Sequence, residues 1–157
     1  ISIAKNAFDS EGSVKTALEW SACPDLARYE FICPNVFQPG TDSRRKEHAS
    51  GWRYMVHEMD DPGVDFDQQV GPILALGEIL PLKLVTFSAG KSLHAWYSMK
   101  NHRDKAREFL DASQRLGGDP AFERFTQLSR LPGGTRPGKG RQTILYHSRL
   151  NEDSSEP

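Results

Sequence analysis

Residues 82–99 read LKLVTFSAGKSLHAWYSM, two apolar stretches separated by a short polar turn. Both stretches, Leu82–Phe87 and Leu93–Met99, are rich in the β-branched and aromatic residues that favour strands. Because only a small, flexible turn around Ser88–Lys91 separates them, the two strands are predicted to form a hairpin. An antiparallel sheet is therefore the expected core of the fold.

Further strands and helices are predicted around this hairpin. The strands are Tyr29–Cys33, ending at Pro34, Trp52–Met59, ending at Asp60-Asp61-Pro62-Gly63, and Thr143–Tyr146. The helices are Ser13–Trp20 with Ser13 as N-cap, Phe66–Leu80, in which Gly71-Pro72 would delay the start to Pro72, and His102–Leu116, ended by Gly117-Gly118. Gln38–Ser50 is polar and is expected to be a loop. The order indicates a mixed α/β (α+β) domain with a largely antiparallel sheet.

Composition limits the class of protein. The chain has 157 residues, with 20 Lys and Arg against 21 Asp and Glu, which fits one domain over 1–150 followed by a flexible acidic tail at 151–157. A mean hydropathy of −0.60 and the lack of any apolar run of roughly 18 residues exclude a membrane span, and 8 Phe, 4 Tyr and 3 Trp exclude a disordered chain. Two cysteines, Cys23 and Cys33, are too few for a disulfide scaffold or a zinc cluster, so a reducing, cytoplasmic location is expected.

The sequence Glu58-Met59-Asp60 places two acids at a strand end. Side chains two residues apart share one face of a strand, with their Cα atoms roughly 6–7 Å apart. Carboxylate oxygens are the ligands that Mg²⁺ and Mn²⁺ prefer, and substrate phosphates commonly complete the coordination shell. The pair is therefore a candidate metal site. The alternative is an ordinary solvated strand end.

The turn from Ser88 to His94 is a candidate phosphate site. Ala89-Gly90-Lys91-Ser92 is not a Walker P-loop, because the position of the first required Gly is Val85 and a strand follows Ser92. Lys91 would supply positive charge, while Ser92 and His94 alternate onto one face of the outgoing strand. Such a turn suits a triphosphate. The alternative is a plain hairpin turn with a histidine at the edge of the core.

The third candidate is the stretch from Arg130 to Gln142, which has four cationic residues, no acid, and interleaved Gly and Pro. It suits phosphate because arginine donates in a planar fork, although a basic loop can also serve solubility alone. The cations are Arg130, Arg136, Lys139 and Arg141. Asp119, before Pro120, is either a turn or helix-cap residue or a third carboxylate for the acid pair.

Taken in order, these motifs resemble those of the archaeo-eukaryotic primase superfamily, in particular the primase-polymerase domains of bacterial mobile elements and phages. The first family motif, a pair of acids one residue apart, is similar to Glu58-Met59-Asp60, with Glu where the family usually has Asp. The second motif, Ser-x-His, is matched by Ser92-Leu93-His94, and the third, a single acid, by Asp119. The run from Gln127 to Arg136 is also similar, so the likeness covers about Tyr29 to Tyr146. Nothing resembles the zinc module or helicase that often accompanies such cores.

The resemblance implies an RRM-like sheet with flanking helices plus a small N-terminal α/β unit, and template-directed nucleotidyl transfer from an NTP or dNTP. Glu58, Asp60 and Asp119 would hold two divalent ions, Mg²⁺ or Mn²⁺, roughly 3.5–4 Å apart. The triphosphate would contact Lys91, Ser92, His94, Arg130 and Arg136, with Ser88 acting through the turn.

The partners implied are a single-stranded DNA template with its primer, contacted by Arg44, Arg45, Lys139 and Arg141, and also a helicase domain or protein. Two other functions stay open. One is a non-catalytic RRM-type binding module that stacks bases on Tyr54 and Trp96, and the other is a metal-dependent nuclease.

Overall fold

A computed structural model describes residues 1–61 and 63–149, and it has a four-stranded antiparallel sheet at its centre. The strands are β5 (Tyr54–Glu58), β6 (Leu82–Phe87), β7 (Leu93–Ser98) and β11 (Thr143–His147). The strand order is β11-β6-β7-β5, and every neighbouring pair is antiparallel. The predicted hairpin is confirmed as β6 and β7.

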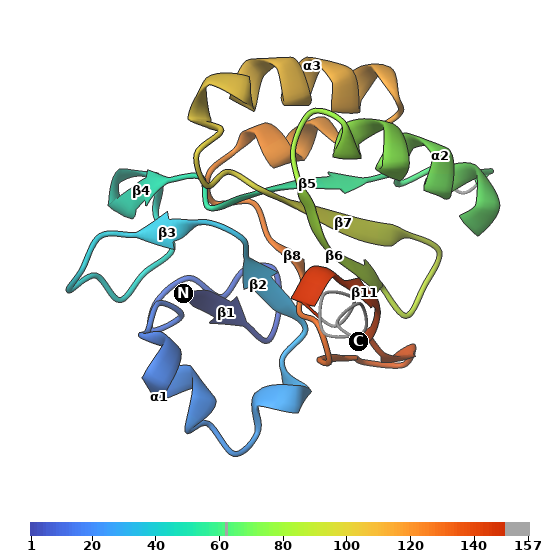
Figure 1. Cartoon of the computed structure of the whole chain (residues 1–157). Coiled ribbons are helices and arrows are strands. Elements are labelled where there is room, and N and C mark those ends of the chain that lie inside the picture. The colour runs from blue at the N-terminus through green and yellow to red at the C-terminus, as the bar shows by residue number, and fades with distance from the viewer. Residues whose placement is uncertain (62, 150–157) are drawn as a thin grey trace, which may run out of the picture.

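Two helices cover one face of this sheet (Figure 1). They are α2 (Phe66–Gly77) and α3 (Ala106–Arg115). Ile73 and Leu76 of α2 and Phe109 of α3 pack with Val85 and Tyr97 of the sheet in the main hydrophobic core. Because side chains alternate along a strand, the neighbours of these core residues, such as His94 and Trp96 in β7, project from the other face.

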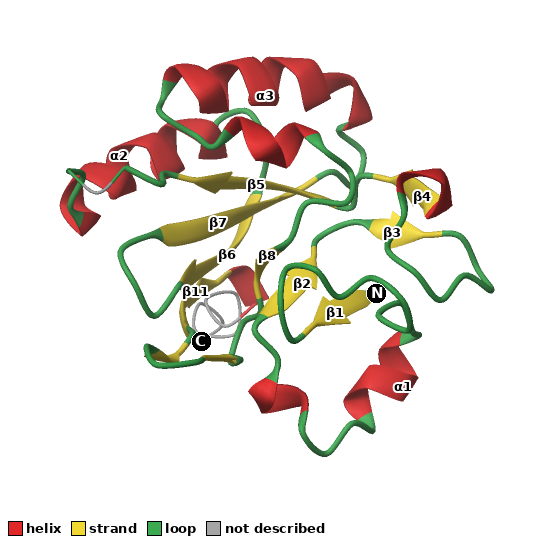
Figure 2. Ribbon diagram, turned by 180° about the vertical axis from the view of Figure 1, so that it is seen from behind, coloured by secondary structure: helices red, strands yellow, loops and turns green. Residues whose placement is uncertain are grey.

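A second, three-stranded sheet lies on that other face (Figure 2). Its order is β1-β2-β8, all antiparallel. A small apolar cluster of Val56, Trp96 and Phe122, with Ile32 of β2 against it, joins the two sheets. The strands are β1 (Ser2–Ala4), β2 (Phe31–Cys33) and β8 (Ser129–Arg130), with α1 (Ala17–Ser21) nearby in the chain. The mixed α/β architecture predicted from the sequence is thus confirmed, including the N-terminal α/β unit.

Shorter elements complete the described fold. The paired strands are β3 (Val36–Phe37) with β4 (Ala49–Gly51), and β9 (Thr135–Arg136) with β10 (Gly140–Arg141). The 3-10 helices are Leu26–Arg28, Lys46–His48, Arg103–Lys105 and Pro120–Glu123. In the part of the chain that is described, no helix has the length and apolarity to cross a bilayer.

Several boundaries differ from the predictions. The first helix begins at Ala17, because Thr16 and Glu19 form a capping box, whereas Ser13 is buried and its Oγ lies 3.0 Å from Ser2 Oγ. The helix α2 starts at Phe66 and continues through Pro72, since Asp65 and Gln68 form a second capping box. The helix predicted over His102–Leu116 has a first turn of 3-10 type, and its α-helical part is Ala106–Arg115.

The predicted loop over 38–50 contains a 3-10 turn and most of β4. The predicted tail at 151–157 lies outside the described residues. Cys23 and Cys33 are both free, and burial raises the pKa of the Cys33 thiol to about 11.

Candidate active site

The first two sequence motifs meet at one end of the four-stranded sheet. Glu58, the last residue of β5, is the direct partner of His94 in β7, and His94 is also the partner of Thr86 in β6. Both Glu58 and His94 face away from α2 and α3, toward the three-stranded sheet. The site therefore lies between the two sheets, where the strand carrying the acids ends.

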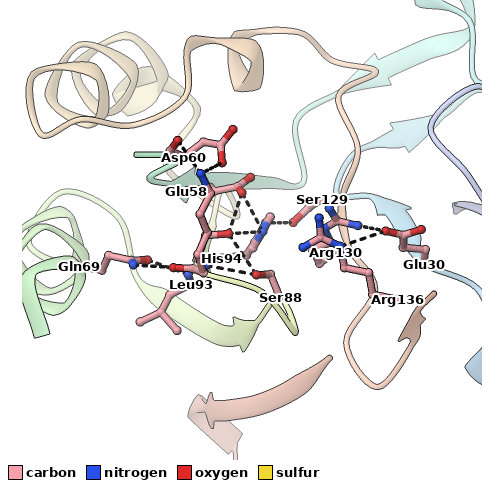
Figure 3. A network of polar contacts seen from close by, with 12 residues as sticks. Glu30, Glu58, Asp60, Gln69, Ser88, Leu93, His94, Ser129, Arg130 and Arg136 are labelled. Atoms are coloured by element: carbon pink, nitrogen blue, oxygen red, sulfur yellow. Dashed lines mark hydrogen bonds and ion pairs between the residues drawn. The ribbon is translucent and has the colours of Figure 1, made fainter. Parts of the chain in front are cut away.

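Glu58, Ser92 and His94 form one hydrogen-bonded group. Figure 3 shows Glu58 and His94 pointing toward each other. Ser92 Oγ donates to Glu58 Oε1 at 2.9 Å, and His94 Nε2 lies 3.2 Å from the same oxygen. The other ring nitrogen, His94 Nδ1, lies 3.0 Å from Ser129 Oγ in β8. The His94 side chain is only 2% exposed and that of Glu58 17% exposed. These contacts fix the histidine ring and the carboxylate relative to each other.

The surroundings of Glu58 favour its ionised form. Burial on its own would raise the pKa of this carboxyl. The hydrogen bond and charge interaction with His94, the hydrogen bond from Ser92 and the positive charge of Arg130 outweigh burial, so the pKa lies below its usual value. Glu58 is thus a carboxylate, able to accept a cation, at neutral pH.

Asp60 is the more accessible of the two acids. Its side chain is 68% exposed, and Lys91 Nζ lies 3.0 Å from its Oδ1. The same ammonium donates to the backbone carbonyl of Asp60 at 3.2 Å. Contributions of such exposed ion pairs to stability are small, about 0–1 kcal/mol. The contact places Lys91, from the turn between β6 and β7, beside the acid pair.

The turn between β6 and β7 is held by side chains on both sides. Ser92 N–H donates to Ser88 Oγ at 3.3 Å, and Ala89 adopts a left-handed conformation with a φ of 56°. The buried Gln69 of α2 donates to the Lys91 carbonyl at 3.0 Å and accepts from Leu93 N–H at 2.8 Å. The turn is therefore a fixed structure that positions Lys91.

Two arginines close the site on the side of the second sheet. Arg130 and Arg136 both form ion pairs with Glu30, which precedes β2, and the Arg130 guanidinium also lies 4.5 Å from the centroid of the Phe31 ring. Together with the acids and the turn they border a pocket of about 250 Å³. Its lining contains seven of the predicted residues: Glu58, Asp60, Lys91, Ser92, His94, Arg130 and Arg136.

Asp119 lies beside the acid pair through its backbone. Its N–H donates to the Glu58 carbonyl at 2.9 Å, while its side chain caps a 3-10 helix by accepting from Ala121 N–H at 2.8 Å. Within residues 1–61 and 63–149, no three His, Cys, Asp or Glu side chains form a group that could hold a metal ion. The donor chemistry of the Glu58 and Asp60 carboxylates in one pocket fits a hard divalent ion as two ligands. The role of Asp119 as a third ligand stays a prediction.

The residues predicted to contact the template lie elsewhere. The Arg44 guanidinium donates to the backbone carbonyls of Thr126, Ala7 and Asp9, and Arg45 pairs with Glu11 at 2.5 Å. Lys139, in the turn between β9 and β10, and Arg141, in β10, are both exposed. None of these four borders the pocket.

Sequence reasoning missed three residues that organise the site. Glu30 pairs with both arginines, Gln69 holds the turn, and Ser129 contacts His94. Glu30 and Ser129 act over separations of 100 and 35 residues, so no local spacing identifies them. Ser129 does lie within the stretch that carries the family resemblance, directly before Arg130.

Trp96, one of the two rings expected to stack bases, is not open to them. Trp96 is 5% exposed and is packed in the cluster between the two sheets, edge-on to Tyr54 with ring centroids 5.8 Å apart. RRM-type binding requires aromatic rings that bases can reach on the sheet surface. The structure therefore does not favour an RRM-type binding module on this face.

Comparison with known proteins supports the fold. No model of a known protein family matches the sequence, and no curated protein matches it. Among solved structures, the chain is similar to the archaeo-eukaryotic primase (AEP) domain of the primase-polymerase of cyanophage S-2L. The TM-score is 0.59 at 17% sequence identity, and the match covers 86% of this chain and 71% of that one. The chain thus has the fold of an AEP domain.

Proposed function

We propose that this protein is a template-directed nucleotidyltransferase, a primase-polymerase that adds an NTP or dNTP to a 3′-hydroxyl on single-stranded DNA. One observation carries the proposal. Two carboxylates and three cationic side chains from separate parts of the chain border a single pocket of about 250 Å³. Nucleotidyl transfer needs this combination, since acids bind the metal while cations bind the phosphates.

The cationic side of the pocket would bind the triphosphate. Lys91 supplies a point charge, and Arg130 and Arg136 supply planar donor groups that suit phosphate oxygens. Glu30 holds both guanidinium groups before the nucleotide arrives. Positioning of donors in advance strengthens the interaction with the charge that develops on the leaving pyrophosphate.

The acidic side would hold the metal. Glu58 and Asp60 are the ligands we propose, and phosphate oxygens of the nucleotide would complete the shell, as is usual for Mg²⁺. When bound, Mg²⁺ or Mn²⁺ supplies Lewis acidity toward the primer hydroxyl and the leaving pyrophosphate. Asp119, whose backbone adjoins Glu58, is proposed as the further ligand. His94 and Ser92 keep Glu58 oriented and ionised through their contacts with Oε1.

A primer-extension assay tests the proposal. The whole chain is incubated with single-stranded DNA, with and without an annealed primer, labelled nucleotides, and Mg²⁺ or Mn²⁺. Products longer than the input are expected, and they should disappear when the metal is chelated. Shortened products would instead indicate a metal-dependent nuclease. Binding of DNA with no labelled nucleotide incorporated under either metal would contradict the proposed reaction.

A further inference from the structure

A second and larger hollow lies at the opposite end of the four-stranded sheet from the acids. Its volume is about 1190 Å³, and it is bordered where β5 and β6 begin and where β7 and β11 end. We call it the basic groove. None of its lining residues is shared with the pocket around Glu58.

The charge of the basic groove differs from that of the chain as a whole. The chain has a net charge of −1, but five of the fourteen lining residues are Lys or Arg and one, Asp104, is an acid. None of the five forms an ion pair with a described residue. These cations are Arg53, Lys83, Lys100, Arg103 and Arg149. A concave surface with several cations available for pairing favours a polyanion.

The walls of the groove are fixed by the backbone. Met99 N–H donates to the Arg53 carbonyl at 3.1 Å, and His102 N–H donates to the Met99 carbonyl at 3.1 Å. Between them, Asn101 adopts a left-handed conformation with a φ of 64°, which asparagine tolerates better than most residues. The turn after β7 therefore holds Lys100 and Arg103 on the same rim as Arg53.

An aromatic residue adds a second kind of contact. Tyr54 borders the groove, and the Arg53 guanidinium lies 5.7 Å from the centroid of its ring. Tyr54 is neither fully buried nor fully exposed. Proteins that bind single-stranded nucleic acids combine a positively charged groove with aromatic rings on which bases stack. Both features are present here.

The groove and the acid pair lie on the same face of the sheet. Tyr54 and Glu58 are four residues apart in β5, an even spacing, and Tyr54 packs in the same cluster as Val56 on the face away from the helices. At about 3.3 Å per residue, roughly 13 Å separate their Cα atoms. A single strand of nucleic acid spans this distance with a few nucleotides.

We propose that the basic groove binds single-stranded nucleic acid, with backbone phosphates on Arg53, Lys83, Lys100 and Arg103 and a base against Tyr54. Assigning this strand as the template of the reaction rests on the proposed function. The binding itself does not, because the groove shares no residue with the acid pocket. The groove is also separate from Arg44, Arg45, Lys139 and Arg141, the positions predicted from the sequence.

The test measures binding of a fluorescent single-stranded oligonucleotide to the whole chain by anisotropy, without nucleotide or divalent metal. Lys100→Glu/Arg103→Glu reverses two exposed charges of the groove. The matched control, Lys15→Glu/Arg115→Glu, reverses two exposed charges outside both pockets. Tyr54→Leu keeps an apolar side chain but removes the ring. Circular dichroism checks that each variant is folded.

We expect the groove variant to bind the oligonucleotide at least about tenfold more weakly. The slope of log K against log[salt] should become less steep by roughly 1.4, because two phosphate contacts are lost. Tyr54→Leu should weaken binding by about fivefold or more. The control should stay within about twofold of the wild type. Equal losses in the groove and control variants, no loss in the groove variant, or tighter binding of duplex than of single strands would each overturn the proposal. Tight single-strand binding with no primer extension would refute the proposed reaction alone.

Discussion

Gly90, in the turn between β6 and β7, lies against Arg136 so closely that a Cβ atom built on it would be 2.5 Å from Arg136 Nη1. The turn that carries Lys91 and the hairpin that carries Arg136 are thus in direct contact, although 45 residues separate Lys91 from Arg136 in the printed sequence. The contact places a cation from each segment in the same pocket.

This contact predicts the effect of Gly90→Ala. The added methyl group must displace the Arg136 guanidinium, which is the far end of a flexible side chain, so stability should change little. Nucleotide affinity should fall by about three- to tenfold, as expected for a weakened charge-assisted hydrogen bond. Titration with a fluorescent nucleotide analogue measures it. Gly71→Ala, with open space around its Cβ position, is the control. Unchanged nucleotide affinity in Gly90→Ala would show that Arg136 does not contact the nucleotide.

His94→Ala should affect nucleotide binding more than DNA binding. The variant removes one of the two side chains that contact the largely buried Glu58 carboxylate. The pKa of Glu58 should therefore rise, because burial favours the neutral form. Activity should then be lost at a higher pH on the acidic side of its profile. Parallel titrations with nucleotide and with single-stranded DNA check the first expectation, and the pH profile of extension checks the second. Equal losses of affinity for both ligands would argue against a role of His94 in the nucleotide pocket.

The buried His57 predicts a pH dependence of stability. Burial lowers the pKa of His57 to about 4, from an ordinary value near 6.5, although the charge of Glu58 acts in the opposite direction. The unfolded chain therefore binds more protons between these values, so the free energy of unfolding decreases as the pH falls from 6.5 toward 4. The full shift corresponds to about 3 kcal/mol.

Urea unfolding at pH 6.5, 5.5 and 4.5 measures this decrease. Glu58 changes the free energy of unfolding mainly below this pH range, because its pKa is lowered from 4.5. His57→Asn removes the titrating ring while retaining a group able to contact Ser113 Oγ, which lies 2.9 Å from His57 Nδ1. The variant should show a flatter pH dependence than the wild type. The same pH dependence in both proteins would show that His57 is not the group responsible.

Gly118 should be intolerant of a side chain. A Cβ atom there would be 2.3 Å from Ser113 Oγ, 2.8 Å from His57 Nδ1 and 2.8 Å from the Ser113 backbone oxygen. Gly118→Ala must therefore shift the end of α3 or β5, at a cost of about 1–3 kcal/mol. The midpoint of urea unfolding should fall, whereas Gly71→Ala should not lower it. Wild-type stability in Gly118→Ala would show that Ser113 and His57 do not pack closely against this position.

The parts of the fold that local pattern encodes were predictable. The strand-forming residues before Asp60-Asp61-Pro62-Gly63 put Glu58 at a strand end, alternation put Ser92 and His94 on one face, and the small polar turn identified the hairpin. The start of α1 was not predictable. Ser13 looks like an N-cap, but its hydroxyl donates to the Ser10 carbonyl and contacts Ser2 Oγ. Pro72 is a strong helix breaker locally, yet α2 continues through it with Ile73 and Leu76 buried in the core.

The candidate site shows the same division. Residues that follow a motif, such as Lys91 and Ser92, were identified from spacing, whereas Glu30 and Gln69 were not. Glu30 reaches the arginines only because β2 pairs with β8, and Gln69 reaches the turn only because α2 packs on the sheet. Such contacts depend on the assembled fold, so a single sequence gives no signal for them.

We propose Glu58 and Asp60 as the ligands of the metal that nucleotidyl transfer requires, beside the cationic pocket. The most direct measurement compares primer extension by Asp60→Asn with that by Asp67→Asn, an exposed acid of α2 outside the pocket. Asp60→Asn should fold normally and form no extended product with Mg²⁺ or Mn²⁺, while Asp67→Asn should extend primers like the wild type. Metal-dependent synthesis retained by Asp60→Asn would show that Asp60 is not a ligand of the catalytic metal.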